Sequence, residues 1–339
     1  MKGLLTAFNG LLKRLRIDAY ILAILTAVIV ASILPARGGV SLSLGWITKV
    51  VIAVLFFLHG ARLSREAVIA GLAHWRLHLT VLAATFVLFP LLGVLASFAP
   101  ASVMSAPIAA GVLFLCCLPS TVQSSIAFTS IARGNVAAAV CAASASNLFG
   151  IFLSPLLASM LLRSHGGFSL DAVWAIVAQL LAPFLAGQLV RPWIGQWVDK
   201  RKAMLGLFDR SSIILIVYTA FSEAVVRGIW SQVSVLEIVR LLVICMALLG
   251  AVLAATAFGS RIMGFSREDQ ITIVFCGSKK SLASGVPMAS ILFPAASVGL
   301  IVLPLMIFHQ IQLMACAFLA QKYAARPSEI EERAAVAVN

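Results

Sequence analysis

Two adjacent lysines stand in the middle of a long apolar segment, where a positive charge is costly. Residues 275–287 around them read Phe-Cys-Gly-Ser-Lys-Lys-Ser-Leu-Ala-Ser-Gly-Val-Pro, and the lysines are Lys279 and Lys280. Lys279 lies 12 residues, or about 18 Å of helix, beyond Arg267 at the polar start of the segment. A lysine at the centre of a bilayer costs roughly 2.5–3.5 kcal/mol on insertion scales. With no acidic side chain positioned to neutralise them, we interpret the pair as an anion-attracting site; the alternative is a loop open to the cytoplasm with both lysines solvated.

A second apolar segment carries a comparable polar interruption. Residues 118–125 read Leu-Pro-Ser-Thr-Val-Gln-Ser-Ser. Pro119 has no N–H and frees a carbonyl of the preceding turn, and polar groups at membrane depth are tolerated only where they face protein or water. We predict a broken helix at each interruption, with an ordinary proline kink as the alternative here. The candidate binding residues at the two interruptions are Ser120, Thr121, Gln123, Ser124, Ser125, Ser278, Lys279, Lys280 and Ser281.

Three further polar residues in apolar surroundings join the candidate site. Asn135 and Asn147 lie at the start and in the middle of the segment that follows the first interruption, and His309 lies in the last apolar segment. A histidine there could relay protons near neutral pH. A histidine bonded to a helix carbonyl accounts for His309 equally well.

The elements that hold these residues are membrane helices. Of 339 residues, 62% are hydrophobic and 11% charged, with a mean hydropathy of +1.07, which excludes a soluble domain of this size. The whole chain, 1–339, is expected to form one polytopic unit in the lipid bilayer. The net charge of +13 does not indicate a nucleic-acid partner, because the basic residues lie in short loops without interleaved aromatics. The sequence has no interior carboxylate pair, HExxH motif or Ser-His-Asp arrangement, so nothing in it indicates an enzyme, and no cofactor is expected.

Ten segments are long and apolar enough to cross a bilayer. They cover residues 19–35, 44–60, 77–98, 106–130, 135–162, 171–190, 211–229, 234–260, 268–294 and 297–321. Lys and Arg fall mainly in alternate connections, which predicts that both termini are cytoplasmic in a bacterial-type inner membrane.

The ten segments divide naturally into two sets of five. The first set covers about 18–162 and the second about 171–322. Asp18 and Asp171 precede corresponding segments, and the polar interruptions fall in the fourth segment of each set. An odd number of spans per set forces the two sets to lie oppositely in the membrane, and paired interrupted segments indicate a transporter's site near the midplane.

Several short motifs together resemble those of the bile acid:sodium symporter family (solute carrier family 10), and more closely the divergent branch that includes its seventh member. The motifs are the two interruptions, Ala132-Arg133-Gly134-Asn135, Ser154-Pro155-Leu156, Gly285-Val286-Pro287-Met288 and Phe308-His309. The resemblance implies a panel domain of helices within 19–60 and 171–229, and a core domain within 77–162 and 234–321. It also implies that broken helices 4 and 9 cross in the core, with the substrate between the domains.

The resemblance carries over poorly at the sodium ligands. Sodium-coupled members have a Glu, a Gln and an Asn where this chain has Phe275, Lys279 and Lys280. Only Ser125 matches a ligand position in the fourth helix, so it is the one residue expected as a Na⁺ ligand. We expect a lysine ammonium to take the place of one sodium ion, which argues against Na⁺ coupling; H⁺ coupling through a lysine or His309 is the alternative.

These observations predict a secondary active transporter of a small organic anion that works by alternating access. One lysine is expected to face the substrate cavity and the other to bind backbone carbonyls at the break. The alternative is a non-transporting membrane regulator or scaffold built on a transporter fold. The sequence specifies no oligomeric state.

Overall fold

All regular elements in the described part of the chain are helices. The computed structural model describes residues 19–62, 74–100, 102–162, 181–226, 228 and 233–325. Six helical stretches within these residues are long and apolar enough to cross a membrane. This confirms the prediction of an all-α integral membrane protein.

The helices follow the expected segments. In chain order they are α2 (Ala19–Ile33), α3 (Gly38–Arg62), α5 (Trp75–Ala83), the π-helical turn η1 (Ala84–Leu88), α6 (Phe89–Ser97), α7 (Ala106–Cys117), α8 (Gln123–Ile131), α9 (Val136–Leu161), α11 (Ala182–Lys200), α12 (Lys202–Val226), α14 (Val235–Ile262), α15 (Arg267–Gly277), α16 (Leu282–Leu292) and α17 (Ala295–Ala324). The first half of the expected segment 171–190 lies outside the described residues, which resume at 181, and the second half falls in α11.

One helix begins well before its expected start. The expected segment 211–229 corresponds to α12, which begins at Lys202. Its polar first turns are held by tertiary contacts: Leu205 packs with Leu58 and Val198, and Asp209 forms an ion pair with an arginine at the end of α3. Burial in these contacts stabilises a helical segment that hydropathy alone excludes from the span.

The fourth and ninth expected segments are each broken in the middle. The segment 106–130 divides into α7 and α8, and the segment 268–294 divides into α15 and α16. Pro119 follows the end of α7, where its missing N–H cannot continue the helix. At the second break Ser281 restarts the helix, because its Oγ accepts a hydrogen bond from the backbone N–H of Ser284 at 3.2 Å.

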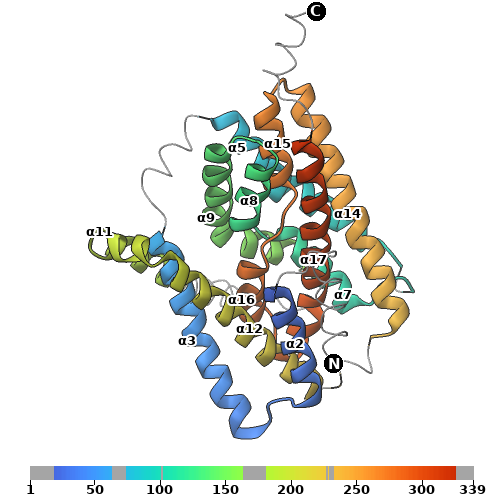
Figure 1. Cartoon of the computed structure of the whole chain (residues 1–339). Coiled ribbons are helices and arrows are strands. Elements are labelled where there is room, and N and C mark those ends of the chain that lie inside the picture. The colour runs from blue at the N-terminus through green and yellow to red at the C-terminus, as the bar shows by residue number, and fades with distance from the viewer. Residues whose placement is uncertain are drawn as a thin grey trace, which may run out of the picture.

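Four helices, α2, α3, α11 and α12, form a group on one side of the molecule (Figure 1). Helices α3 and α11 cross in close contact at Gly60 and Gly187, since a Cβ on Gly187 would lie 2.0 Å from the Phe57 carbonyl oxygen. Gln188 Nε2 donates to the Gly60 carbonyl at 2.7 Å across the same crossing. Small residues thus let the two backbones approach as they do in other membrane helix pairs.

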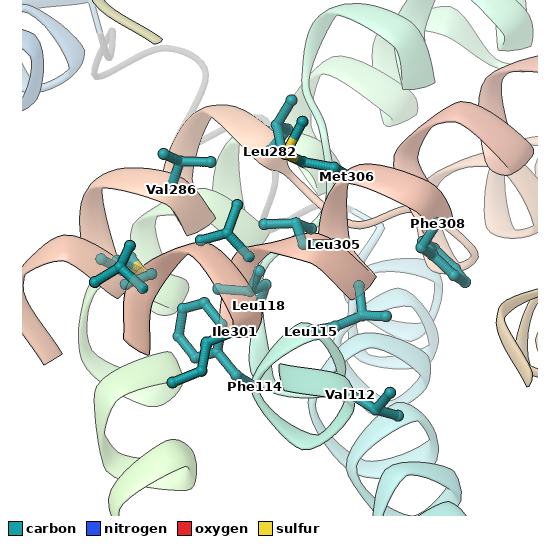
Figure 2. Close-up of a cluster of buried hydrophobic side chains, with 14 of the residues drawn as sticks. Val112, Phe114, Leu115, Leu118, Leu282, Val286, Ile301, Leu305, Met306 and Phe308 are labelled. Carbon is teal, nitrogen blue, oxygen red and sulfur yellow. The ribbon is translucent and has the colours of Figure 1, made fainter. Parts of the chain in front are cut away.

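The remaining described helices form a larger bundle that α12 contacts through α16 and α17. In Figure 1, α8 and α15 lie in the upper part of this bundle and α7 and α16 in the lower part, so the two broken helices run in opposite senses. Figure 2 shows Leu118, Ile301 and Leu305 in the apolar core beside the breaks. A Cβ on Gly285 would fall 2.4 Å from a methyl carbon of Leu118 and 2.5 Å from one of Leu305, so a side chain at this position would displace both leucines.

Candidate functional site

The two helix breaks touch and satisfy each other's backbone groups. Ser281 N–H donates to the Pro119 carbonyl at 2.9 Å. In the other direction Ser120 Oγ donates to the Cys276 carbonyl at 2.6 Å. Ser125 Oγ donates to the Phe275 carbonyl at 3.3 Å. Irregular backbone at membrane depth is tolerated only where protein or water supplies such partners, so each break makes the other possible.

The amine of Lys280 is bound by three backbone carbonyls where the breaks meet. Its Nζ donates to Thr85 O and Cys116 O at 2.8 Å and to Leu118 O at 2.7 Å. It also lies 4.1 Å from the centre of the Phe89 ring. The side chain is fully buried. All three ammonium protons therefore have acceptors, and the amine lies at the C-terminal end of α7, where the helix dipole favours a cation.

The sequence of the third membrane helix, formed by α5, η1 and α6, explains why the Thr85 carbonyl is available. In the π-helical turn η1 the hydrogen bonds run five residues back, as from Phe89 N–H to the Ala84 carbonyl. The residue five positions after Thr85 is Pro90, which has no N–H. The Thr85 carbonyl thus loses its helical donor and takes the Lys280 ammonium instead.

A glutamine on α17 fixes the backbone of Lys280. The backbone N–H of Lys280 donates to Gln312 Oε1 at 2.8 Å, and Gln312 Nε2 donates to the Lys280 carbonyl at 2.9 Å. This pair sets the amide orientation, so the same Nε2 donates to His309 Nδ1 at 2.9 Å. His309 then carries its ring proton on Nε2 when neutral.

Lys279 has a different environment from its neighbour. Its side chain is also fully buried, but Nζ has no hydrogen-bond partner among the described residues. The amine lies 4.4 Å from the centre of the Phe128 ring and 5.8 Å from that of Phe275. Contrary to the expectation of a lysine facing an open cavity, Lys279 is enclosed, because aromatic rings of α8 and α15 cover it.

Helix α9 ties the two breaks together through its side chains. Asn147 Nδ2 donates to the Ser120 carbonyl at 2.7 Å, and its Oδ1 accepts from Ser284 Oγ at 3.0 Å. Ser146 Oγ accepts from the Ser120 N–H at 3.0 Å. On the other side of the first break, Thr121 Oγ1 lies 2.6 Å from Ser124 Oγ. The site is thus a connected polar network inside an apolar bundle.

The model of the SBF-like CPA transporter family matches residues 18–325, which include every helix described above. The chain belongs to this transporter family. It is 55% identical to an uncharacterized Pseudomonas aeruginosa protein over 91% of this chain and 93% of that one. It is 54% identical to the Escherichia coli K12 protein named "Putative symporter YfeH", over 93% and 95%. It is 29% identical to the Sodium/bile acid cotransporter 7 of Xenopus tropicalis, over 90% and 91%. These relatives confirm the resemblance to the divergent branch of the bile acid:sodium symporters.

Within this family member, the structure gathers most of the sequence-predicted residues at the breaks. Those in contact with one another or lying in the breaks are Ser120, Thr121, Ser124, Ser125, Asn147, Ser278, Lys279, Lys280, Ser281 and His309. Gln123 is the exposed first residue of α8. Ser278 Oγ is buried without a partner among the described residues.

Asn135 does not belong to this cluster. It caps the start of α9, where its Oδ1 accepts from Ala138 N–H, and its Nδ2 donates to Asp269 at 2.9 Å. That position is 12 residues, or about 18 Å of helix, from Asn147. Its residue type is explained by capping and by the tie to the start of α15.

Several groups at the site escape the sequence prediction. Gln312 lies three residues after His309, and that polar pair on one face of an apolar helix was a usable signal. The backbone carbonyls of Thr85, Cys116 and Leu118 carry no residue-type signal at all. Pro90 and Pro119 gave the only hints, because a proline has no N–H and leaves a carbonyl of the preceding turn without a donor.

Proposed function

We propose that this chain is a secondary active transporter of a small organic anion and that the Lys280 ammonium replaces one sodium ion of its sodium-coupled relatives. The observation that carries the proposal is the ring of three carbonyl oxygens around Lys280 Nζ at the contact of two helix breaks. A hard cation such as Na⁺ requires oxygen ligands. Here the three carbonyl oxygens that could bind such a cation accept hydrogen bonds from an ammonium that is attached to the chain. A second cation at that position is repelled, so the proposed cycle does not use Na⁺ there.

The charge of the site favours an anionic solute. The break residues 118–122 and 278–281 contain two lysines and no Asp or Glu. Helices α8 and α16 both begin at the breaks, so the positive ends of two helix dipoles add to the lysine charge. The proposed substrate carries a carboxylate or phosphate group that approaches these helix starts.

The proposed architecture is ten spans in two inverted five-helix repeats. The opposite senses of α7–α8 and α15–α16 in Figure 1 support it. The group of α2, α3, α11 and α12 is assigned to the panel domain and the larger bundle to the core. Alternating access then consists of movement of one group against the other around the breaks. The distribution of Lys and Arg supports an inner-membrane protein with both termini cytoplasmic.

Uptake into proteoliposomes tests the proposal. A panel of radiolabelled mono- and dicarboxylates and organic phosphates is offered with Na⁺ and H⁺ gradients imposed separately. We expect accumulation of at least one anion without Na⁺, and its loss in Lys280→Gln. Uptake that requires Na⁺ and survives both Lys279→Gln and Lys280→Gln would overturn the substitution of sodium by lysine.

Lys49→Gln serves as the matched control, because Lys49 lies outside the breaks beside the Trp46 ring. It is expected to leave uptake unchanged. If no anion of the panel accumulates in the wild-type protein, the result favours a non-transporting regulator over a transporter.

A further inference from the structure

A groove runs along the outer surface of the bundle, between the third membrane helix (α5, η1 and α6) and α14. Its volume is about 330 Å³, and its walls are formed mainly by small residues, among them Ala83, Ala255 and Gly259. The neighbouring outward-facing side chains, such as Leu79 and Phe258, are large, apolar and exposed. This face is therefore turned toward lipid, and the groove is a narrow depression in it.

The groove offers no free hydroxyl donor despite its three hydroxyl residues. Thr80 Oγ1 donates to Arg76 O at 2.8 Å, and Thr256 Oγ1 donates to Val252 O at 2.7 Å. Ser260 Oγ donates to a carbonyl of its own helix at 3.2 Å. Since these donors are used within their helices, the lining is apolar in practice and suits a hydrocarbon chain.

One end of the groove carries fixed positive charge. Arg76 lies one helical turn before Thr80 and bridges to the end of α14, where its Nη2 donates to the Met263 carbonyl at 3.0 Å. Its guanidinium also lies 5.4 Å from the centre of the Phe265 ring. Arg76 is exposed, and so is Arg261, which directly follows the lining residue Ser260. A planar guanidinium held this way still presents N–H groups in the geometry that phosphate requires.

We infer that this groove binds an anionic phospholipid, with one acyl chain between the two helices and the phosphate at Arg76. Apolar lining along its length and arginine charge at one end match the two parts of such a lipid. The site also adjoins the breaks: the lining residues Ala84 and Thr256 face Gly277, whose Cβ would lie 3.1 and 3.2 Å from their side chains. The bound lipid thus supports the helix that supplies the Thr85 carbonyl to Lys280.

Lipid retention measured by native mass spectrometry tests the inference. The full chain is reconstituted in vesicles of phosphatidylcholine and phosphatidylglycerol at a 3:1 ratio, extracted in mild detergent, and its retained lipids are counted. We expect one retained lipid per chain, with phosphatidylglycerol enriched over the vesicle ratio about fivefold, or about five phosphatidylglycerols to three phosphatidylcholines, the effect of one arginine near an anionic headgroup. Arg76→Gln should remove the enrichment.

Variants that fill the groove distinguish lipid binding at this site from nonspecific contact with the surrounding lipid. Ala255→Trp places an indole in the groove and should abolish retention, whereas Ala254→Trp, on the same helix but outside the lining, should retain the lipid. Ala83→Trp fills the groove from the opposite wall and decides the question if Ala255→Trp fails to fold. Equal retention of phosphatidylcholine, a retained fatty acid in place of phospholipid, or retention unchanged in the groove-filling variants would each overturn the inference. None of these readouts depends on transport.

Discussion

Replacing Lys280 by Met removes the ammonium while keeping a side chain of similar length. The change leaves the carbonyls of Thr85, Cys116 and Leu118 without their donor in a site that is fully buried. Three unsatisfied carbonyls at ~2 kcal/mol each and the lost Phe89 ring contact at ~2 kcal/mol outweigh the ~3 kcal/mol relieved by removing a buried ammonium, which leaves a net loss of about 5 kcal/mol. We expect this loss in the free energy of unfolding.

The adjacent lysine supplies the matched control for this measurement. Lys279→Met removes an equally buried amine that has no hydrogen-bond partner among the described residues, so only its aromatic contacts are lost. Those contacts are comparable to the relief of a buried charge, and we expect a change within ~1 kcal/mol. Reversible unfolding in mixed micelles of dodecyl maltoside and sodium dodecyl sulfate, followed by circular dichroism, gives both values. Equal losses in the two variants, or a loss below ~1 kcal/mol in Lys280→Met, would refute the carbonyl-binding role.

Three further predictions concern packing, the backbone clamp and the aromatic cover. Gly187→Ala should lower the free energy of unfolding by roughly 2 kcal/mol or more, because the new Cβ would overlap a carbonyl oxygen. Gly206→Ala is the control: its Cβ would have nothing within 4 Å, so the free energy of unfolding should rise by about 0.5–1 kcal/mol. Unfolding in the same micelles compares the two variants. Gln312→Leu removes the partners of a buried N–H and a buried carbonyl and should cost about 2–3 kcal/mol in that assay. Phe128→Ala uncovers the Lys279 amine, so a water-soluble acylating reagent should modify this lysine in the variant and leave it intact in the wild type, as read by peptide mass spectrometry. If Lys279 reacts equally in both proteins, the Phe128 ring does not shield its amine from water.

The breaks in the fourth and ninth segments were predictable because they depend on local chemistry. Pro119 removes a backbone donor, and lysines in an apolar segment demand polar partners. The early start of α12 was not predictable from hydropathy. Its polar first turns are stabilised by contacts of Leu205 and Asp209 with α3, which lies more than 140 residues earlier in the sequence, and by packing of Leu205 on the preceding helix α11. Tertiary burial there outweighs the local pattern.

The site residues also divide into those that local chemistry predicts and those whose role depends on the tertiary structure. Clustering of the serines, Asn147 and both lysines follows from two breaks that must satisfy each other. Asn135 is different, because an Asn in an apolar segment and an Asn that caps a helix look alike until the helix start is known. Capping is a local role that needs no partner at the breaks.

The roles of the two lysines depend on a residue in another helix. Both lysines lie in the break between α15 and α16, outside either helix, and their amines have different surroundings: that of Lys280 is bound by three carbonyls and that of Lys279 lies beside two aromatic rings. Lys280 binds the Thr85 carbonyl because Pro90, 190 positions earlier, leaves that carbonyl without a donor. Restoring that donor should weaken the demand for an ammonium: a Pro90→Ala chain can bond the Thr85 carbonyl within its own helix, and Lys280→Met should then cost less than it does beside proline. A double-mutant cycle measures this coupling, and strict additivity of the two changes would show that the missing N–H of Pro90 is not what binds the lysine to the third membrane helix.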